Sequence, residues 1–77
     1  MDLWQLNKGQ SAVIKSISDQ LQRDQVRRLL ELGFEPGETI HCEQQMTLGG
    51  PRSFRTSSGV FCLEKNIAHN ITLEKEL

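Results

Sequence analysis

Two histidines and two cysteines are the residues of this chain best suited to bind a metal ion. His41 and Cys42 are adjacent, and Cys62 and His69 follow later in the sequence. Zinc prefers imidazole and thiolate ligands, but its structural sites usually draw two ligands from a short C-x2-C or H-x3-H segment. Neither spacing occurs here, and adjacent residues of a strand point to opposite faces. We therefore expect buried cysteines, exposed histidines, no metal ligands and no cofactor; weak or intermolecular metal binding is the alternative.

Nucleophilic catalysis is the second chemistry that the residue types allow. A catalytic serine or cysteine needs a base and an orienting acid within one concave site. No local signature such as G-x-S-x-G is present, and a chain of 77 residues has little volume for a pocket that excludes water. The loop Gly49-Gly50-Pro51 lacks the G-K-[ST] continuation of a phosphate-binding loop, and Arg52 begins a predicted strand instead of a helix. We expect no enzymatic activity.

Length and charge exclude further classes of protein. Seventy-seven residues are expected to form one domain, residues 1–77. Nine basic and ten acidic residues give a net charge of −1, without the basic excess that favours nucleic-acid or membrane-surface binding. No apolar segment approaches the ~20 residues of a transmembrane helix, and no apolar stretch of a signal peptide follows Met1 and Asp2. We therefore expect a small soluble protein located in the cytoplasm.

Glycines and prolines divide the chain into short pieces, most of which read as strands. β-Branched residues and alternation of apolar with polar residues are typical of half-buried strands. This pattern predicts strands over 11–17, 38–46, 52–56, 60–63 and 71–73. The composition Ser57-Ser58-Gly59 indicates a hairpin turn between the third and fourth strands, and 64–69 is expected to form a short helical turn.

One helix is predicted between the first two strands. Its apolar stripe is Val26, Leu29 and Leu30, and it runs to Leu32 from a start at Asp19 or Asp24, either of which could cap it. Gly33 is placed to take the left-handed conformation that ends a helix, and Phe34 to fold back on the stripe. Pro36-Gly37 then predicts a tight turn.

Five short strands with one helix after the first predict a mostly-β fold, a small closed or nearly closed barrel. Trp4 precedes the first strand with Leu3 and Leu6. It either caps an open end of the barrel or anchors a partner, because tryptophan is enriched in binding hot spots. Phe34 and Phe54 are expected mostly in the core, whereas Leu48 beside two glycines could protrude.

The order of apolar, glycine and proline positions resembles the FeoA family over nearly the whole chain. The matching segments are Leu6-x-x-Gly9, Ala12-Val13-Ile14-x-x-Ile17, Leu29-x-x-Leu32-Gly33-Phe34-x-Pro36-Gly37-x-x-Ile40, Gly50-Pro51 and Val60-x-Cys62-Leu63-x-Lys65-x-x-Ala68-x-x-Ile71-x-Leu73. The pattern is also similar to the C-terminal domain of iron-dependent repressors, which is fused to a DNA-binding domain absent here. A departure is Glu64, where the family often has a basic residue.

The resemblance implies an SH3-like barrel that docks on the cytosolic portion of FeoB, the bacterial ferrous iron transporter. Such a protein would support transport without catalysis and be peripheral to the membrane only through its partner. We predict docking through two glycine-containing turns with apolar side chains. The predicted partner-binding residues are Leu32, Phe34, Pro36, Leu48, Gly49, Gly50, Pro51 and Arg52.

Two alternatives to plain docking follow from the residues. An arginine finger that stimulates nucleotide hydrolysis needs a mobile, exposed arginine, for which Arg52, Arg27 and Arg28 are candidates. Direct handling of Fe²⁺ or Zn²⁺, as a carrier or sensor, is the alternative from another class. We favour a scaffolding or gating contact.

Overall fold

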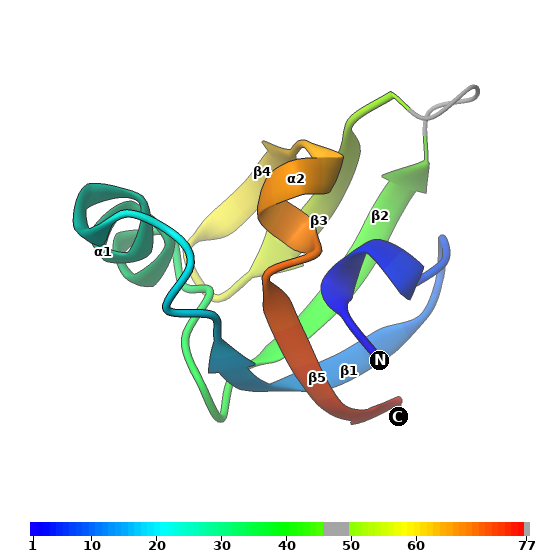
Figure 1. Ribbon diagram of the computed structural model, residues 1–77. Helices are drawn as coiled ribbons and strands as arrows, with labels where there is room; N and C mark the ends of the chain where they lie inside the picture. The colour runs from blue at the N-terminus through cyan, green and yellow to red at the C-terminus, as the bar shows by residue number, and fades with distance from the viewer. Residues whose placement is uncertain (46–49, 77) are drawn as a thin grey trace.

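The computed structural model describes residues 1–45 and 50–76, the last two of them by their backbone alone. Within these residues five antiparallel strands form one sheet in the order β4-β3-β2-β1-β5 (Figure 1). The elements are η1 (Leu3–Gln5), β1 (Ser11–Ile17), α1 (Arg23–Glu31), β2 (Thr39–Gln45), β3 (Arg52–Thr56), β4 (Gly59–Leu63), α2 (Lys65–Ala68) and β5 (Ile71–Glu76). The predicted mostly-β fold, with a helix inserted after the first strand, is confirmed.

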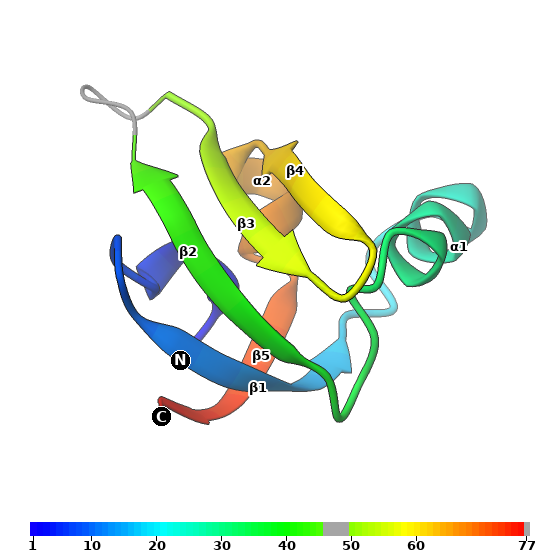
Figure 2. The same ribbon diagram turned by 180° about the vertical axis from the view of Figure 1, so that it is seen from behind.

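The sheet curls into a barrel that stays open between its two end strands (Figures 1 and 2). In the described part of the chain β4 and β5 do not pair with each other, and α2 connects them. The N-terminal segment covers the outer side of β5: Asp2 forms a bridge with Thr72, and the Leu73 amide donates to the Met1 carbonyl at 2.8 Å. One end strand is therefore covered by the chain itself.

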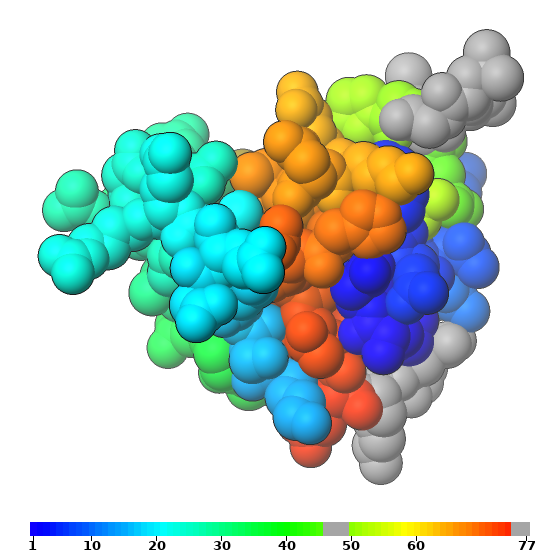
Figure 3. Space-filling model, viewed as in Figure 1, coloured from blue at the N-terminus to red at the C-terminus, as the bar shows by residue number. Residues whose placement is uncertain are grey.

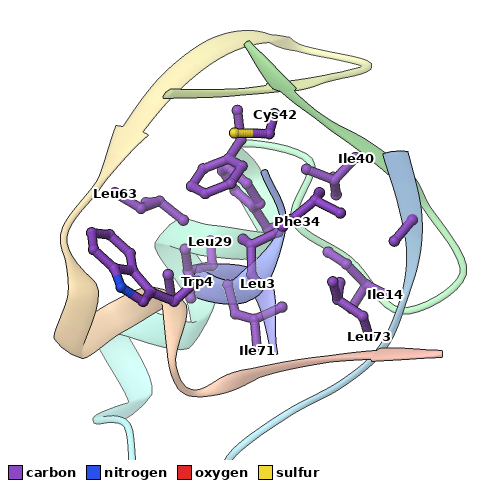
Figure 4. Packing of buried hydrophobic residues seen from close by; sticks show 14 residues of the cluster. Leu3, Trp4, Ile14, Leu29, Phe34, Ile40, Cys42, Leu63, Ile71 and Leu73 are labelled. Atoms are coloured by element: carbon purple, nitrogen blue, oxygen red, sulfur yellow. The ribbon is translucent and has the colours of Figure 1, made fainter. Parts of the chain in front are cut away.

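The core lies in the space that the curled sheet encloses (Figure 4). Its buried apolar residues are Leu3, Trp4, Leu6, Ala12, Ile14, Leu29, Phe34, Ile40, Cys42, Phe54, Leu63, Ala68, Ile71 and Leu73. Trp4 is only 9% exposed and belongs to this cluster. Of the two predicted roles, this burial agrees with a cap on the barrel and not with an exposed anchor for a partner.

The start of α1 differs from the prediction, since the N-cap is Gln22 and neither Asp19 nor Asp24. The side chain of Gln25, three residues into the helix, accepts a hydrogen bond from the Gln22 amide at 2.9 Å. This is the return bond of a capping box, which satisfies the amide of the cap residue without an aspartate.

The end of α1 is a complete Schellman motif, as predicted. Gly33 has φ +96°, and its amide donates to the Leu30 carbonyl at 3.1 Å. The Phe34 amide donates to the Leu29 carbonyl at 2.9 Å. These two bonds satisfy carbonyls that a helix end otherwise leaves unpaired.

Two turns connect the helix and the strands. The amide of Glu38 donates to the Glu35 carbonyl at 2.9 Å, and Gly37 has φ +93°, which confirms the tight turn at Pro36-Gly37. Thr56 pairs with Gly59 in the register of β3 and β4. The hairpin turn is therefore two residues long, and Gly59 opens the strand instead of lying in the turn.

The helices in the described segments are short. None of those between residues 1 and 45 or 50 and 76 is long and apolar enough to cross a membrane.

Candidate docking groove

A groove of about 390 Å³ lies between α1, β4 and α2. Its apolar lining comes from all three elements and the corner after α1: Leu29, Leu32, Phe61, Cys62, Leu63 and Ile67. Polar side chains of α1 line it as well, namely Asp24, Gln25 and Arg28. Figure 3 shows α1 projecting from the barrel beside α2. The arrangement offers an apolar surface with charged groups along one wall.

The groove exists because α1 is attached to the barrel mainly at its C-terminal end. Leu29 is the buried residue of α1, whereas Leu30 is 41% exposed. The Thr56 hydroxyl donates to the Leu32 carbonyl at 2.6 Å and accepts from the Ser58 amide at 3.0 Å. The β3–β4 hairpin thus holds the end of the helix, and the remaining turns extend away from the barrel (Figure 2).

The corner residues predicted to bind a partner fall in different environments. Leu32 is half-buried and lines the groove, and Pro36 is exposed. The prediction for Phe34 is wrong, because its side chain is fully buried and cannot contact a partner. The Schellman motif turns Phe34 inward, where its ring lies 6.5 Å from that of Phe54 and 6.3 Å from that of Phe61, both edge-on.

Pro51, one of the predicted loop residues, lies at the other side of α2 from the groove. Leu48 and Gly49 fall outside the described residues. Gly50 is half-buried, while Pro51 is exposed and lines a second hollow of about 500 Å³. The other residues that line this hollow are Glu64, Lys65, Asn66 and His69. The structure therefore places Leu32 and Pro51 in two separate hollows, both bordered by α2.

Arg52 is held against the N-terminal segment by its own side chain. Its Nη1 donates to the Trp4 carbonyl and, at 3.3 Å, to the Leu6 carbonyl. Its guanidinium carbon lies 4.3 Å from the centre of the Trp4 ring, a cation–π contact. Arg52 is therefore anchored, whereas Arg27 and Arg28 of α1 are exposed.

The two cysteines differ, and the prediction that both are buried is wrong for Cys62. Cys42 is 2% exposed, and burial raises the pKa of its thiol, partly offset by the nearby positive charge of Arg52. Cys62 is exposed because Phe61 and Leu63 take the inward positions of β4. Adjacent residues of a strand alternate between faces, so Cys62 points outward.

The histidines each contact a polar side chain. His41 is half-buried, not exposed as predicted, and its Nδ1 contacts the hydroxyl of Ser11 on β1. His69 is exposed, with Nδ1 2.8 Å from Oδ2 of Asp2. Within residues 1–45 and 50–76, no three His, Cys, Asp or Glu side chains form a group that could hold a metal ion.

Phe61 and Ile67 are groove residues that the sequence reasoning did not assign to a site. The signal for Phe61 was the run Val60-Phe61-Cys62-Leu63, which is apolar on both faces of the strand. Such a run indicates that both faces are covered, or that one is available to another surface. Ile67 gave no comparable signal, because its place beside Leu32 depends on how α2 packs.

Comparison with solved structures gives high similarity over almost all of the chain. The FeoA protein of Stenotrophomonas maltophilia, described as an SH3 domain protein complexed with zinc, is 30% identical, with a TM-score of 0.82 over 96% of this chain and 89% of that one. Iron(II) transport protein A from Clostridium thermocellum is 31% identical, with a TM-score of 0.86 over 96% of this chain and 44% of that one.

A manganese-dependent transcriptional repressor in complex with manganese shares the fold alone. It is 20% identical, with a TM-score of 0.84 over 100% of this chain and 36% of the repressor. A search of curated proteins finds no match.

The FeoA domain model matches residues 1–75. Together with the SH3-like barrel and the likeness to solved FeoA proteins, this match confirms the expected family. The chain belongs to the FeoA family of SH3-like proteins, which are associated with ferrous iron transport.

Proposed function

We propose that this protein is a cytosolic accessory protein of bacterial ferrous iron uptake that docks on the cytosolic part of the FeoB transporter. It supports or regulates transport through this contact, without catalysis of its own, and reaches the membrane only through its partner. Family membership supports the transport process. The observation that carries the docking role is the apolar groove between α1, β4 and α2.

The partly buried apolar lining of the groove makes it suitable for a protein partner. Leu32, Phe61 and Ile67 are partly buried and pack against the core, so they offer apolar area that is already held in place. Ordered apolar side chains lose little conformational entropy on binding, which favours affinity. A partner that inserts apolar side chains here gains burial without first reorganising the barrel.

The contacts of Arg52 argue against its use as an arginine finger. An arginine finger must leave its own domain and enter the partner's nucleotide site. The side chain of Arg52 instead donates to the Trp4 and Leu6 carbonyls and lies on the Trp4 ring. Withdrawing it would leave those contacts unmade, so Arg52 supports the fold of the N-terminal segment.

Two leucines of the same helix region provide a matched test. Leu32 lines the groove, whereas Leu30 is 41% exposed and lines a different hollow with Val26 and Leu21. Calorimetric titration of the purified cytosolic portion of FeoB with wild type, Leu32→Gln and Leu30→Gln compares the two faces of α1. Thermal unfolding of each variant confirms that it is folded.

We expect Leu32→Gln to weaken binding by about tenfold, since one apolar contact in an interface is worth about 1–2 kcal/mol. Leu30→Gln should stay close to wild type. Equal affinity of wild type and Leu32→Gln would remove the groove from the interface, and absence of binding by wild type would remove FeoB as a direct partner.

A further inference from the structure

β4 is a sheet edge that the described part of the chain leaves without a neighbouring strand. It ends the strand order, and β3 is its partner on one side only. The groove touches three consecutive residues of β4: Phe61, Cys62 and Leu63. Because consecutive side chains of a strand point to opposite faces, a hollow that touches all three lies against the edge of the strand. Figure 2 shows β4 outermost in the sheet.

The register of the hairpin determines which backbone groups face this edge. The two-residue turn makes Thr56 and Gly59 the pair that closes the ladder, and pairing continues without a shift at Phe54–Phe61. Antiparallel strands alternate between pairs that exchange both backbone hydrogen bonds and pairs that exchange none. The amides and carbonyls of Val60 and Cys62 therefore point away from β3, toward the groove.

Common protections of a free edge are missing from β4. Natural edges are often blocked by a charged residue, a proline, a bulge or a covering helix or loop. The helices α1 and α2 lie beside β4, but the groove stays open between them. The strand Gly59–Leu63 carries neither a charge nor a proline, and its pairing with β3 has no bulge. Val60 is instead 53% exposed, and Cys62 is exposed beside it. Such an edge is a template for a further strand.

The charges of α1, which lies across the groove from β4, indicate which side chains an added strand should have. The helix α1 holds three arginines, Arg23, Arg27 and Arg28, against two acids, Asp24 and Glu31. Arg28 and Asp24 line the groove, whereas Arg23 and Arg27 line other hollows of the same helix. In the described part of the chain the ion pairs are Arg55–Glu43 and His69–Asp2, so Arg28 is available to a carboxylate of the partner within the groove.

We propose that an extended segment of a partner protein, apolar at alternate positions and carrying carboxylates, adds to the edge of β4 as a sixth strand and occupies the groove beside α1. Backbone hydrogen bonds to Val60 and Cys62 give affinity, and side-chain contacts with the groove and α1 give specificity. A second copy of the chain fits less well, because its own β4 has no carboxylate to offer Arg28. The inference rests on the proposed function only for the identity of the protein that supplies the segment.

A designed peptide tests the binding mode without the transporter. The probe is the hexapeptide acetyl-EVTVEV-amide, added to millimolar concentration to ¹⁵N-labelled full-length protein and followed by NMR. We expect saturable amide shifts concentrated in β4 and α1. Two controls carry N-methyl groups, one on its valines and one on its glutamates and threonine. Each lacks the donors along one edge of the strand, and the control that lacks the donors facing β4 should not give these shifts.

Proline at residue 60 tests the edge from the protein side. The Val60 amide points away from β3, so Val60→Pro removes a hydrogen-bond donor from the free edge of β4 without removing a β3–β4 hydrogen bond. Proline is tolerated at such edge positions. We expect Val60→Pro to weaken peptide binding by about tenfold, and Val60→Thr, which keeps the amide, to stay near wild type. Spectra outside β4 show whether each variant is folded.

The outcomes separate this inference from the proposed function. Absence of saturable shifts, shifts located elsewhere, equal binding of the parent peptide and both N-methylated peptides, or wild-type affinity in a folded Val60→Pro would each overturn strand addition. If Val60→Pro does not fold, the two N-methylated peptides decide alone. Failure of FeoB to bind would leave the peptide result unaffected, and loss of peptide binding would leave the FeoB titration standing.

Discussion

Gly33 lies so close to Thr56 that a Cβ on the glycine would come within 2.7 Å of the threonine hydroxyl. That hydroxyl also donates to the Leu32 carbonyl at 2.6 Å. The residue that ends α1 is therefore also the residue against which the β3–β4 hairpin packs. The position of α1, and with it one wall of the groove, depends on this contact.

Gly33→Ala should destabilise the protein by about 2–5 kcal/mol. Left-handed backbone costs an alanine about 1–2 kcal/mol, and crowding against a packed neighbour costs about 1–3 kcal/mol more. Gly37→Ala is the matched control, because Gly37 has φ +93° but a Cβ there would meet no described atom within 4 Å, its chain neighbours aside. Urea unfolding should show the larger loss for Gly33→Ala; equal losses would mean that the Thr56 contact contributes nothing.

Arg52→Ala should destabilise the protein by about 2 kcal/mol. It removes hydrogen bonds from a charged donor to the Trp4 and Leu6 carbonyls, together with the cation–π contact. The chain has one tryptophan, so its fluorescence reports directly on this region and should shift to longer wavelength.

Arg55→Ala is the control for the loss of an arginine from β3. Arg55 pairs with Glu43 at 2.7 Å, but its side chain is 56% exposed, and exposed ion pairs contribute about 0–1 kcal/mol. Its unfolding midpoint and tryptophan emission should stay close to wild type. A wild-type unfolding curve for Arg52→Ala would show that the anchoring contacts do not stabilise the fold.

The two thiols should react with a thiol reagent at very different rates. Cys62 is exposed, whereas Cys42 is buried and its pKa is raised by burial; the thiolate is the reactive form. We expect one fast thiol in the native protein and two in urea. Cys62→Ser should abolish the fast phase and Cys42→Ser should retain it; a fast phase in Cys62→Ser would contradict the assignment.

Stability should fall at alkaline pH through Cys42. Its pKa is higher in the folded than in the unfolded state, so above about pH 8.5 the unfolded thiol loses its proton first. The unfolded state then binds fewer protons, and the free energy of unfolding decreases as pH rises. Unfolding from pH 7 to 10 should show a steeper decrease in wild type than in Cys42→Ala. A Cys62→Ala variant with the wild-type slope is the expected control result.

Local structure followed closely from local sequence. Alternation located β1 (Ser11–Ile17) and β3 (Arg52–Thr56) at both ends, because each strand presents one face to the core. Gly33 and Phe34 identified the end of the helix, since few residues tolerate the left-handed conformation there. The family pattern rests on these same positions.

Errors arose where the environment of a side chain depends on distant segments. Phe34 was expected to serve both core and surface, and the rings of Phe54 and Phe61 decide that it is core. Arg52 was expected to be exposed, and its partners are the carbonyls of Trp4 and Leu6, more than forty residues away. Contacts of this kind leave no periodic trace in the sequence.

The sequence alone determined the number of strands and their order along the chain, the helix end and the turn at Pro36-Gly37, because each depends on residues within a few positions of one another. The family was also recognised from the sequence, through the order of such local patterns along the chain. Only the tertiary structure decided that β4 lies at the edge of the sheet, that Cys62 faces outward, and that α1 is held by the contact of Gly33 with Thr56. These three features produce the groove. They depend on strand order and on packing between segments far apart in the chain, which local propensity does not encode.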